Sequence, residues 1–209
     1  AFVNAFYKDE SSNLWIATDD GLLYKPVHGK EKVYVHQPDN PNSPSITGIS
    51  TMIADKEGNL WLGTYEAVTP SQKLAQLDKF NPATGKFTHY TISTKWKATR
   101  IYNLCFDDNE RSLWIGTDNG LFEMNTQTGN ISRQFRHNRT DTNGISNNWV
   151  NQVAPYGTFL WISTFSGLDR LNKKNGSWQH YLVRQAVNCV YKDTEGILWA
   201  GTTGGLFRY

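Results

Sequence analysis

The sequence predicts an all-β fold, a β-propeller built from four-stranded blades. The dipeptide Leu-Trp recurs five times, and its tryptophans stand 46, 53, 47 and 38 residues apart, at Trp15, Trp61, Trp114, Trp161 and Trp199. A period of about 40–50 residues fits one four-stranded unit per repeat. The composition is rich in strand-forming aromatic residues, with 8 Trp, 10 Tyr and 10 Phe. No segment has the 3.6-residue periodicity of an amphipathic helix.

Each repeat opens on a predicted strand such as "ISTMIAD" or "VNCVYKD". A four-residue turn follows, opened by an aspartate and closed by a glycine, as in Asp55–Gly58 and Asp193–Gly196. Aspartate in this position accepts backbone N–H bonds of its own turn. We therefore expect a turn-stabilising role for the aspartates that share this position, Asp9, Asp55, Asp107 and Asp193.

The second predicted strand is the Leu-Trp segment, which ends at a threonine. A small residue precedes that threonine and leaves room for the blade to seat against a neighbour; these residues are Ala17, Gly63, Gly116, Ser163 and Gly201. The third strand begins at Gly-Leu in four of the five repeats, and a turn such as "NPATGK" leads to the fourth. This order gives four complete blades and three strands of a fifth, in a single propeller domain or propeller fragment, at about 1–46, 47–98, 99–147, 148–184 and 185–209.

The pattern D-x-x-G-x-LW-[IL]-G-T-x-x-G-L resembles the two-component regulator propeller repeat. It is most complete at Asp55–Thr64, Ser112–Leu121 and Asp193–Leu206, and the stretches "HQPDNPNSPSITGIS" and "RHNRTDTNGISNNWV" resemble the linkers of that family. The resemblance implies the extracytoplasmic sensory part of a hybrid histidine kinase, often one that senses polysaccharide breakdown products. Other members of the family are coupled to diguanylate cyclases. The resemblance also implies a ring of about seven blades, so we expect this chain to form part of a larger ring.

The charge and the cysteines limit the classes of partner. The net charge is +2, from 21 basic and 19 acidic residues that are scattered along the chain, which gives no reason to expect nucleic acid as a partner. No apolar stretch reaches the ~18 residues of a membrane span, so we expect no membrane contact by this segment. Cys105 and Cys189 are too few for a disulfide framework, and we expect both to be buried as small apolar side chains.

The second repeat departs from the pattern. About eight extra residues, within Glu66–Gln76, separate its second and third predicted strands. Insertions in repeat proteins fall in loops and often lie on the binding face. A binding role and a neutral surface excursion both fit this insertion.

Histidines and acidic residues are the candidates for chemistry. Four of the five histidines follow an aromatic-x-His pattern on the fourth predicted strand, and we interpret them as one repeat position: His36, His89, His137 and His180. The ring holds equivalent positions apart, so packing or capping is the favoured role, and we expect no metal and no cofactor. Asp19 and Asp118 lie in rim loops, and with Glu66 they are the candidates for catalysis. A glycosidase needs two carboxylates roughly 5–10 Å apart.

The candidate ligand-binding residues are those that break the repeat near the rim. The linkers into each first strand and the loops after each Leu-Trp strand should share one face, and the sequence varies there. Aromatic rings stack on sugars, while amides and guanidinium groups hydrogen-bond sugar hydroxyls. The candidates are Tyr65, Glu66, Trp96, Arg100, Tyr102, Asp118, Arg139, Asn148, Trp149 and Phe165. For Tyr102 and Trp149, a place in the core of the first strand is the alternative.

We therefore expect a non-catalytic sensory propeller on the periplasmic or extracytoplasmic side of a membrane-anchored regulator, which recognises an oligosaccharide. Its partners would be that ligand, further blades and signalling domains of the parent chain, and, as an open alternative, a second copy in a homodimer. Two other function classes stay open. A propeller-fold polysaccharide lyase or glycoside hydrolase would show clustered carboxylates or a His–Arg–Tyr group. A protein-interaction scaffold would show a large contiguous apolar patch on its rim.

Overall fold

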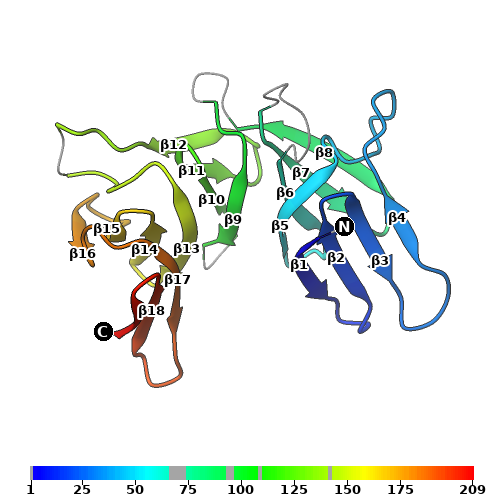
Figure 1. Ribbon diagram of the computed structural model, residues 1–209. Coiled ribbons are helices and arrows are strands. Elements are labelled where there is room, and N and C mark those ends of the chain that lie inside the picture. The colour runs from blue at the N-terminus through cyan, green and yellow to red at the C-terminus, as the bar shows by residue number, and fades with distance from the viewer. Residues whose placement is uncertain (1, 66–73, 93–96, 108–109, 141–142) are drawn as a thin grey trace. The chain divides into compact units, whose positions relative to one another are not determined.

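The computed structural model describes residues 2–65, 74–92, 97–107, 110–140 and 143–209 (Figure 1). Over these residues the chain forms 19 strands and no helix. The described part accordingly offers no helix that could cross a membrane. The strands form four sheets of four strands and one sheet of three. The all-β prediction and the prediction of four complete blades with a partial fifth are both confirmed.

The blades follow one another along the chain, and each consists of consecutive strands. Blade 1 contains β1 (Val3–Lys8), β2 (Leu14–Thr18), β3 (Gly21–Lys25) and β4 (Lys32–Tyr34). Blade 2 contains β5 (Gly48–Ala54), β6 (Leu60–Tyr65), β7 (Gln76–Asn81) and β8 (Lys86–Thr91). Blade 3 contains β9 (Ile101–Phe106), β10 (Ser112–Thr117), β11 (Gly120–Asn125) and β12 (Ile131–Phe135). Blade 4 contains β13 (Val150–Tyr156), β14 (Phe159–Thr164), β15 (Gly167–Asn172) and β16 (Trp178–Tyr181). Blade 5 contains β17 (Val187–Lys192), β18 (Leu198–Thr202) and β19 (Gly205–Arg208).

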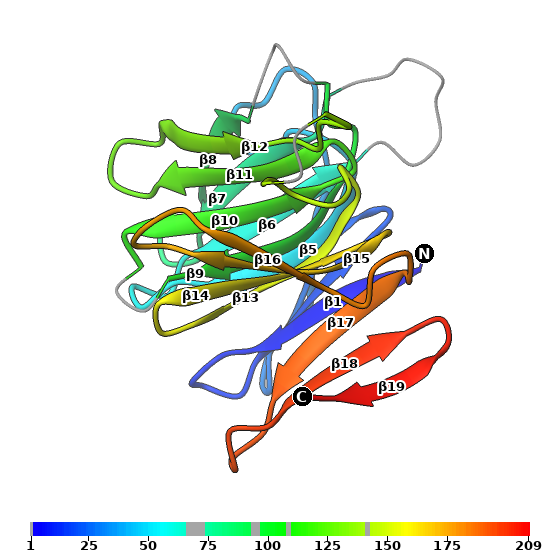
Figure 2. The same cartoon turned by 90° about the vertical axis from the view of Figure 1, so that its left-hand side faces the viewer.

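Strands pair in chain order within each blade, so the first and the last strand form its two edges. The pairing is antiparallel; in blade 4, Trp161 of β14 lies opposite Ala154 of β13 and Arg170 of β15. Figure 2 shows blade 5 in orange and red, with β18 between β17 and the edge strand β19. A sheet of this order needs only tight turns between its strands, which matches the turn residues of the sequence.

The contacts of the chain divide it into two compact units, Ala1–Ile101 and Tyr102–Tyr209. Unit 1 contains blades 1 and 2, and unit 2 contains blades 4 and 5 together with blade 3 from its second residue onward. The core of unit 1 lies between its blades. There, Trp15 and Leu22 of blade 1 pack with Ile49 and Leu62 of blade 2.

Unit 2 repeats this packing between blades 3 and 4, where Trp114 and Leu121 meet Val150 and Val153. The small residue after the tryptophan makes this approach possible, because a Cβ on Gly116 would lie 2.9 Å from Val150 Cγ1. The prediction that small residues permit close blade packing is confirmed. The structure adds that the incoming side chain is the first residue of the next blade's first strand.

A β-bulge in the first strand adds a directional contact between blades. The pairing register shifts near the start of that strand in blades 1, 2, 4 and 5, at Asn4, Ser50, Asn151 and Asn188. Asn4 Nδ2 donates to the carbonyl oxygen of Ile49 at 3.0 Å, and Asn151 Nδ2 donates to that of Val187 at 2.9 Å. We call this bond the inter-blade brace. The bulge turns the side chain toward the next blade, as bulges do elsewhere.

The aspartates of the first turns accept the backbone bonds predicted for them. The donors are the N–H groups of Asn13, Asn59, Ser112 and Ile197, which lie 2.8, 2.8, 3.2 and 2.9 Å from Oδ1 of Asp9, Asp55, Asp107 and Asp193. Each turn thus ends on a hydrogen bond that also starts the second strand.

Apolar positions that are buried in other blades are exposed in blades 1 and 5. Val3 is 64% exposed, whereas Ile49 and Val150, which hold the same register position, are 0% exposed. Leu206 of β19 is 67% exposed, whereas its equivalent Leu121 is 0% exposed. These positions carry the packing between blades, so blades 1 and 5 each present an uncovered blade-packing surface.

The two cysteines do not both follow the prediction of burial. Cys105 is half-buried, but Cys189 is exposed, so the prediction is wrong for Cys189. Its equivalent in blade 4, Gln152, reaches blade 5, where Gln152 Oε1 accepts the N–H of Val190 at 2.6 Å. Cys189 therefore occupies a position that faces the next blade, and no described strand of unit 2 follows blade 5.

Candidate ligand-binding site

The turns between second and third strands lie at the same end of each blade as the linkers between blades. The motif threonine closes these turns: Thr117 Oγ1 donates to the carbonyl oxygen of Gly120 at 2.8 Å and accepts the N–H of Asn119 at 3.0 Å. Thr64 does the same for a much longer connection, because its Oγ1 donates to the carbonyl oxygen of Gln76 at 2.8 Å. The two ends of the longer connection in blade 2 are therefore joined by the same threonine hydrogen bond as in the short turn of blade 3.

In unit 2, three predicted site residues form a stack of aromatic rings at this end. The Tyr102 and Trp149 rings lie 5.4 Å apart at 28°, and the Trp149 and Phe165 rings lie 6.1 Å apart at 39°. Trp149 is 44% exposed and Phe165 is 60% exposed, so the core alternative for Trp149 is wrong. We call Tyr102, Trp149 and Phe165 the aromatic trio. Adjoining exposed rings suit the C–H faces of sugars.

Tyr102 occupies a position that other blades use for structure. It is the second residue of its first strand, where Asn4 and Asn151 form the inter-blade brace. A tyrosine side chain stacks on Trp149 instead. Blade 3 therefore places an aromatic side chain at the position from which blades 1 and 4 form the inter-blade brace.

Hydrogen bonds hold the backbone of the trio at Trp149 and Phe165. The N–H of Phe165 donates to the carbonyl oxygen of Trp149 at 3.1 Å, and the N–H of Trp149 donates to Asn147 Oδ1 at 2.8 Å. Asn147 Nδ2 also donates to Ser166 Oγ at 2.7 Å. These hydrogen bonds thus join the linker before blade 4 to the turn after β14. A preformed surface of this kind loses little conformational freedom on binding.

Asn148, a predicted ligand-binding residue, has structural partners. Its Oδ1 accepts the N–H of His137 at 2.8 Å, and its carbonyl oxygen accepts the N–H of Gly120 at 2.7 Å. These bonds join both ends of the linker between blades 3 and 4 to the turn of blade 3. The amide oxygen of Asn148 is engaged in holding the linker.

In unit 1, Tyr65 and Arg100 come together with Asp19. The Arg100 guanidinium lies 4.1 Å above the centre of the Tyr65 ring, and the Tyr65 hydroxyl donates a hydrogen bond to Asp19. Asn4 Nδ2 donates to the same carboxylate at 2.8 Å. The hydrogen bonds from Tyr65 and Asn4 lower the pKa of Asp19, whereas burial raises the pKa of Tyr65 and its bond to Asp19 raises it further. Asp19 is therefore held as an ionised acceptor, which does not suit a general acid.

The remaining predicted residues do not join these clusters in the described structure. Glu66 and Trp96 lie outside the described residues. Asp118 begins the turn after β10, and Arg139 lies in the linker between blades 3 and 4. A ligand-binding role for each of them stays a prediction.

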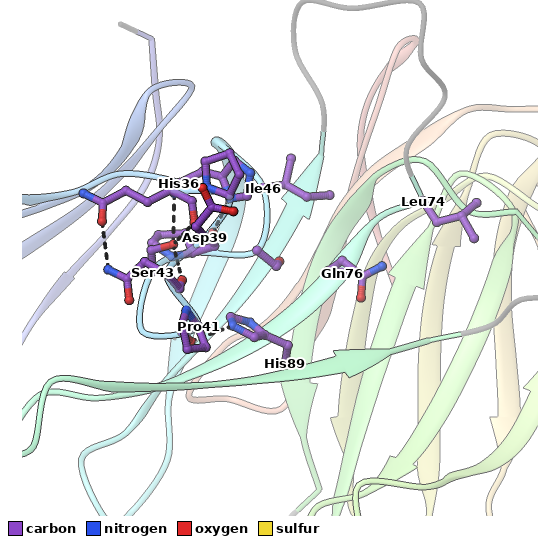
Figure 3. A pocket seen from close by; sticks show the side chains of 13 residues that line it. His36, Asp39, Pro41, Ser43, Ile46, Leu74, Gln76 and His89 are labelled. Carbon is purple, nitrogen blue, oxygen red and sulfur yellow. Dashed lines mark hydrogen bonds between the residues drawn. The ribbon is translucent and has the colours of Figure 1, made fainter.

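A hollow of about 630 Å³ lies beside the linker between blades 1 and 2 in unit 1. We call it the unit 1 hollow. Figure 3 shows His89 reaching from β8 to Pro41, while Leu74 and Gln76 lie on the other side. His89 Nδ1 lies 2.8 Å from Asp78 Oδ1, and His89 Nε2 lies 3.1 Å from the carbonyl oxygen of Pro41. Because both neighbours accept hydrogen bonds, chiefly Asp78, the pKa of His89 is raised.

Unit 2 has a hollow of about 280 Å³ at the equivalent linker, which we call the unit 2 hollow. As in unit 1, a histidine of the fourth strand pairs with a buried aspartate beside the hollow. His180 Nδ1 lies 2.7 Å from Asp169 Oδ1, and the N–H of Ser146 donates to Asp169 Oδ2 at 2.7 Å. Asp169 is 0% exposed, so these donors satisfy a wholly buried carboxylate. The walls are His137, Asn138, Arg139, Gly144, Ile145, Ser146, Ser166, His180, Val183 and Arg184.

The prediction that four histidines share one repeat position is wrong. His89 and His180 lie within the fourth strands and pair with Asp78 and Asp169. His36 and His137 follow their fourth strands, and their Nδ1 atoms lie 2.8 and 2.9 Å from linker carbonyl oxygens. The aromatic-x-His pattern misleads because blades 2 and 4 place an aromatic residue after the histidine as well, and that residue takes the paired position.

Sequence reasoning missed the buried aspartates that support both hollows. The signal was present, because Asp78–His89 and Asp169–His180 have the same separation of 11 residues on adjoining third and fourth strands. No group of three or more histidine, cysteine or acidic side chains suited to a metal ion occurs among the residues that the structure describes.

Comparisons with known proteins agree with this architecture. The extracellular domain of BT3049 from B. thetaiotaomicron, described as a hybrid two-component system, matches with a TM-score of 0.81 at 21% identity over 100% of this chain. The fold is that of a β-propeller. The extracellular domain of BT4673 from the same organism, described as a one-component system, matches with a TM-score of 0.78 at 21% identity over 99% of this chain. The chain spans only 28% and 29% of the lengths of those two extracellular-domain chains.

A gluconolactonase, XC5397 from Xanthomonas campestris, matches with a TM-score of 0.64 at 13% identity, over 100% of this chain and 71% of that one. Likeness at these identities establishes the fold and leaves the function to the site. In sequence, residues 43–66 and 181–204 match the model of the family described as two component regulator propeller. No curated protein matches the chain.

Proposed function

We propose that this chain is a sensory part of an extracytoplasmic propeller in a two-component-type regulator, and that it binds an oligosaccharide without transforming it. The aromatic trio is the observation that supports a sugar as the ligand. Its rings adjoin one another, Trp149 and Phe165 are exposed, and hydrogen bonds hold the backbone at these two residues. Stacked rings offer a sugar a flat apolar surface at little cost in conformational entropy.

The location and the parent protein rest on the comparisons. Two segments of the chain match the two component regulator propeller model, and the two B. thetaiotaomicron structures are extracellular domains of signalling systems. These findings support an extracytoplasmic position for this chain. Binding would act by favouring one of two signalling states of the parent chain.

We propose further blades of the parent chain as partners for blades 1 and 5. In blade 1, Val3 and Phe6 are 64% and 75% exposed, whereas Val153, the equivalent of Phe6 in blade 4, is 2% exposed. In blade 5, Leu206 is 67% exposed. Additional blades would bury these side chains as the other blades bury theirs.

Isothermal titration calorimetry of the whole chain with a panel of oligosaccharides tests the proposed ligand class. We expect at least one sugar to bind and Trp149→Ala to weaken its binding about tenfold, since one stacked ring contributes about 1.4 kcal/mol. Tyr191→Ala is the matched control, because Tyr191 is an aromatic residue of unit 2 that is 63% exposed on β17, away from the trio. Equal losses in both variants, or none in either, would contradict the trio as the binding surface.

The enzyme alternative has one specific observation in its favour, the group formed by Asp19, Tyr65 and Arg100. The lowered pKa of Asp19 argues against it as a proton donor. Chromatography of the sugars after the titration separates the two functions. Unchanged sugars support recognition, and shortened or unsaturated products that vanish in Asp19→Asn would establish catalysis instead.

A further inference from the structure

The unit 2 hollow differs in charge from the unit 1 hollow, although the same repeat positions build both. Arg139 and Arg184 line the unit 2 hollow. In the unit 1 hollow, Pro38 takes the place of Arg139, two residues after the linker histidine, and Asp39 contributes an acidic side chain. The repeat therefore supplies a scaffold for the hollow, and the two arginines are specific to unit 2.

The backbone at Arg184 is held in a strained conformation that places the residue on the wall. Arg184 has a φ of 68°, in the left-handed region that side chains rarely adopt. Its N–H donates to the carbonyl oxygen of Ser166 at 2.8 Å, so the neighbouring turn holds this conformation. Strain of this kind persists where surrounding bonds fix it, and it concentrates at functional sites.

No acidic residue is among the described residues that line the unit 2 hollow, and Asp141, two residues after Arg139 in the sequence, lies outside the described residues. Among the described residues, no ion pair joins Arg139 or Arg184 to a carboxylate. Asp169 supports the wall, but it is 0% exposed and accepts bonds from Ser146 and His180. The described wall of the hollow is therefore cationic, with Val183, which is 63% exposed, as its apolar part.

The hollow adjoins the aromatic trio through shared chain segments. Ser166 lines the hollow, and Phe165 of the trio precedes it in the same turn. Ser146 also lines the hollow, and the linker that carries it ends at Trp149. A sugar stacked on the trio could thus extend one substituent or one further residue to the arginines.

We propose that unit 2 recognises an acidic oligosaccharide, with Arg139 and Arg184 binding its carboxylate or sulfate group while the trio stacks on its rings. Guanidinium groups pair with carboxylates and with tetrahedral oxyanions through two charge-assisted hydrogen bonds. This inference rests on the proposed function, because it assigns the chemical class of the same ligand.

Matched acidic and neutral sugars test the inference by calorimetry on the whole chain. The probes are trigalacturonate and its methyl ester, and a sulfated chondroitin tetrasaccharide and its desulfated counterpart. We expect one acidic probe to bind at least tenfold more tightly than its partner with the lower charge, and Arg139→Gln and Arg184→Gln each to weaken it about tenfold. Arg111→Gln is the control, because it removes the same charge from an exposed turn at the opposite end of blade 3. Thermal unfolding verifies that each variant is folded.

The outcomes separate this inference from the proposed function. Loss of acidic-sugar binding in both arginine variants, with Arg111→Gln unchanged, supports the assignment, and the preferred pair distinguishes carboxylate from sulfate. Binding of the less charged probes that depends on Trp149 but not on the arginines would overturn the acidic ligand and leave sugar recognition standing. Binding of none of the four probes, while other neutral sugars bind, would also overturn it. Failure of every sugar would overturn both.

Discussion

The indole Nε1 of Trp61 donates a hydrogen bond of 2.9 Å to Oδ2 of Asp55, which precedes it by six residues. The same bond joins Trp15 to Asp9 at 3.2 Å and Trp199 to Asp193 at 2.8 Å. The aspartate thus caps its turn with one oxygen and orients the buried indole with the other. This link gives a physical reason for the six-residue spacing between the aspartate and the tryptophan in blades 1, 2 and 5.

Asp55 and Trp61 are expected to be energetically coupled. Burial would raise the pKa of Asp55, but hydrogen bonds led by that of Trp61 more than offset it, so the pKa lies below 3.8. We predict that Asp55→Ala destabilises the fold by about 2 kcal/mol, because a bond to a charged group is lost. A double-mutant cycle with Trp61→Phe, followed by urea unfolding, should give a coupling of about 1 kcal/mol. A coupling near zero would show that the bond contributes nothing.

The stability that His89 contributes is expected to depend on pH. The pKa of His89 is raised above 6.5, chiefly by the hydrogen bond to Asp78. Its contribution is therefore complete below pH 6.5 and is lost as the pH rises through the folded-state pKa. The difference in melting temperature between the native chain and His89→Gln should shrink as the pH rises over an interval that begins below 6.5. A constant difference across that interval would contradict a protonated His89.

The substitutions Tyr102→Asn and Asn151→Tyr should affect the stability of the fold and sugar binding in different ways. Tyr102→Asn places an amide where Asn151 forms the inter-blade brace, so we expect stability to be retained or to rise by about 0.5–1 kcal/mol. Sugar binding should fall, because the trio loses a ring. Asn151→Tyr should lower stability by about 1–2 kcal/mol. Chemical denaturation and calorimetry measure both, and a large loss of stability in Tyr102→Asn would assign Tyr102 to the core.

Leu206 and Leu121 hold the same repeat position with opposite exposure, 67% and 0%. We predict that Leu121→Ala costs about 3 kcal/mol, as expected for a buried leucine, whereas Leu206→Ala changes stability by less than about 0.5 kcal/mol. Thermal unfolding of the two variants checks this. A longer chain that supplies a following blade should make Leu206→Ala as costly as Leu121→Ala, and equal small effects there would contradict the proposed blade partner.

The sequence was sufficient for the blade order because the repeat is local. Each turn aspartate, each Gly-Leu start and each Leu-Trp strand acts within a few residues, so the pattern predicts them directly. The register of the fourth strand was not accessible in this way. Aromatic residues stand on both sides of His89 and His180, and only pairing with Asp78 and Asp169 decides which position each histidine takes.

The site was predictable in part, for a similar reason. Tyr102, Trp149 and Phe165 stood out because they depart from the repeat, and the fold brings them together although they come from three separate segments. Arg184 did not stand out. Its role depends on a left-handed backbone conformation and on a hydrogen bond to the turn at Ser166. Neither feature can be recognised from the residues next to Arg184 in the sequence.

A crystal structure of the chain with the tightest-binding oligosaccharide from the calorimetric panel tests the central claim most directly. The account predicts a sugar ring stacked against Trp149 and Phe165, with the Tyr102–Trp149 stacking kept as in the free chain. A sugar bound elsewhere, with the trio uncovered, would contradict it.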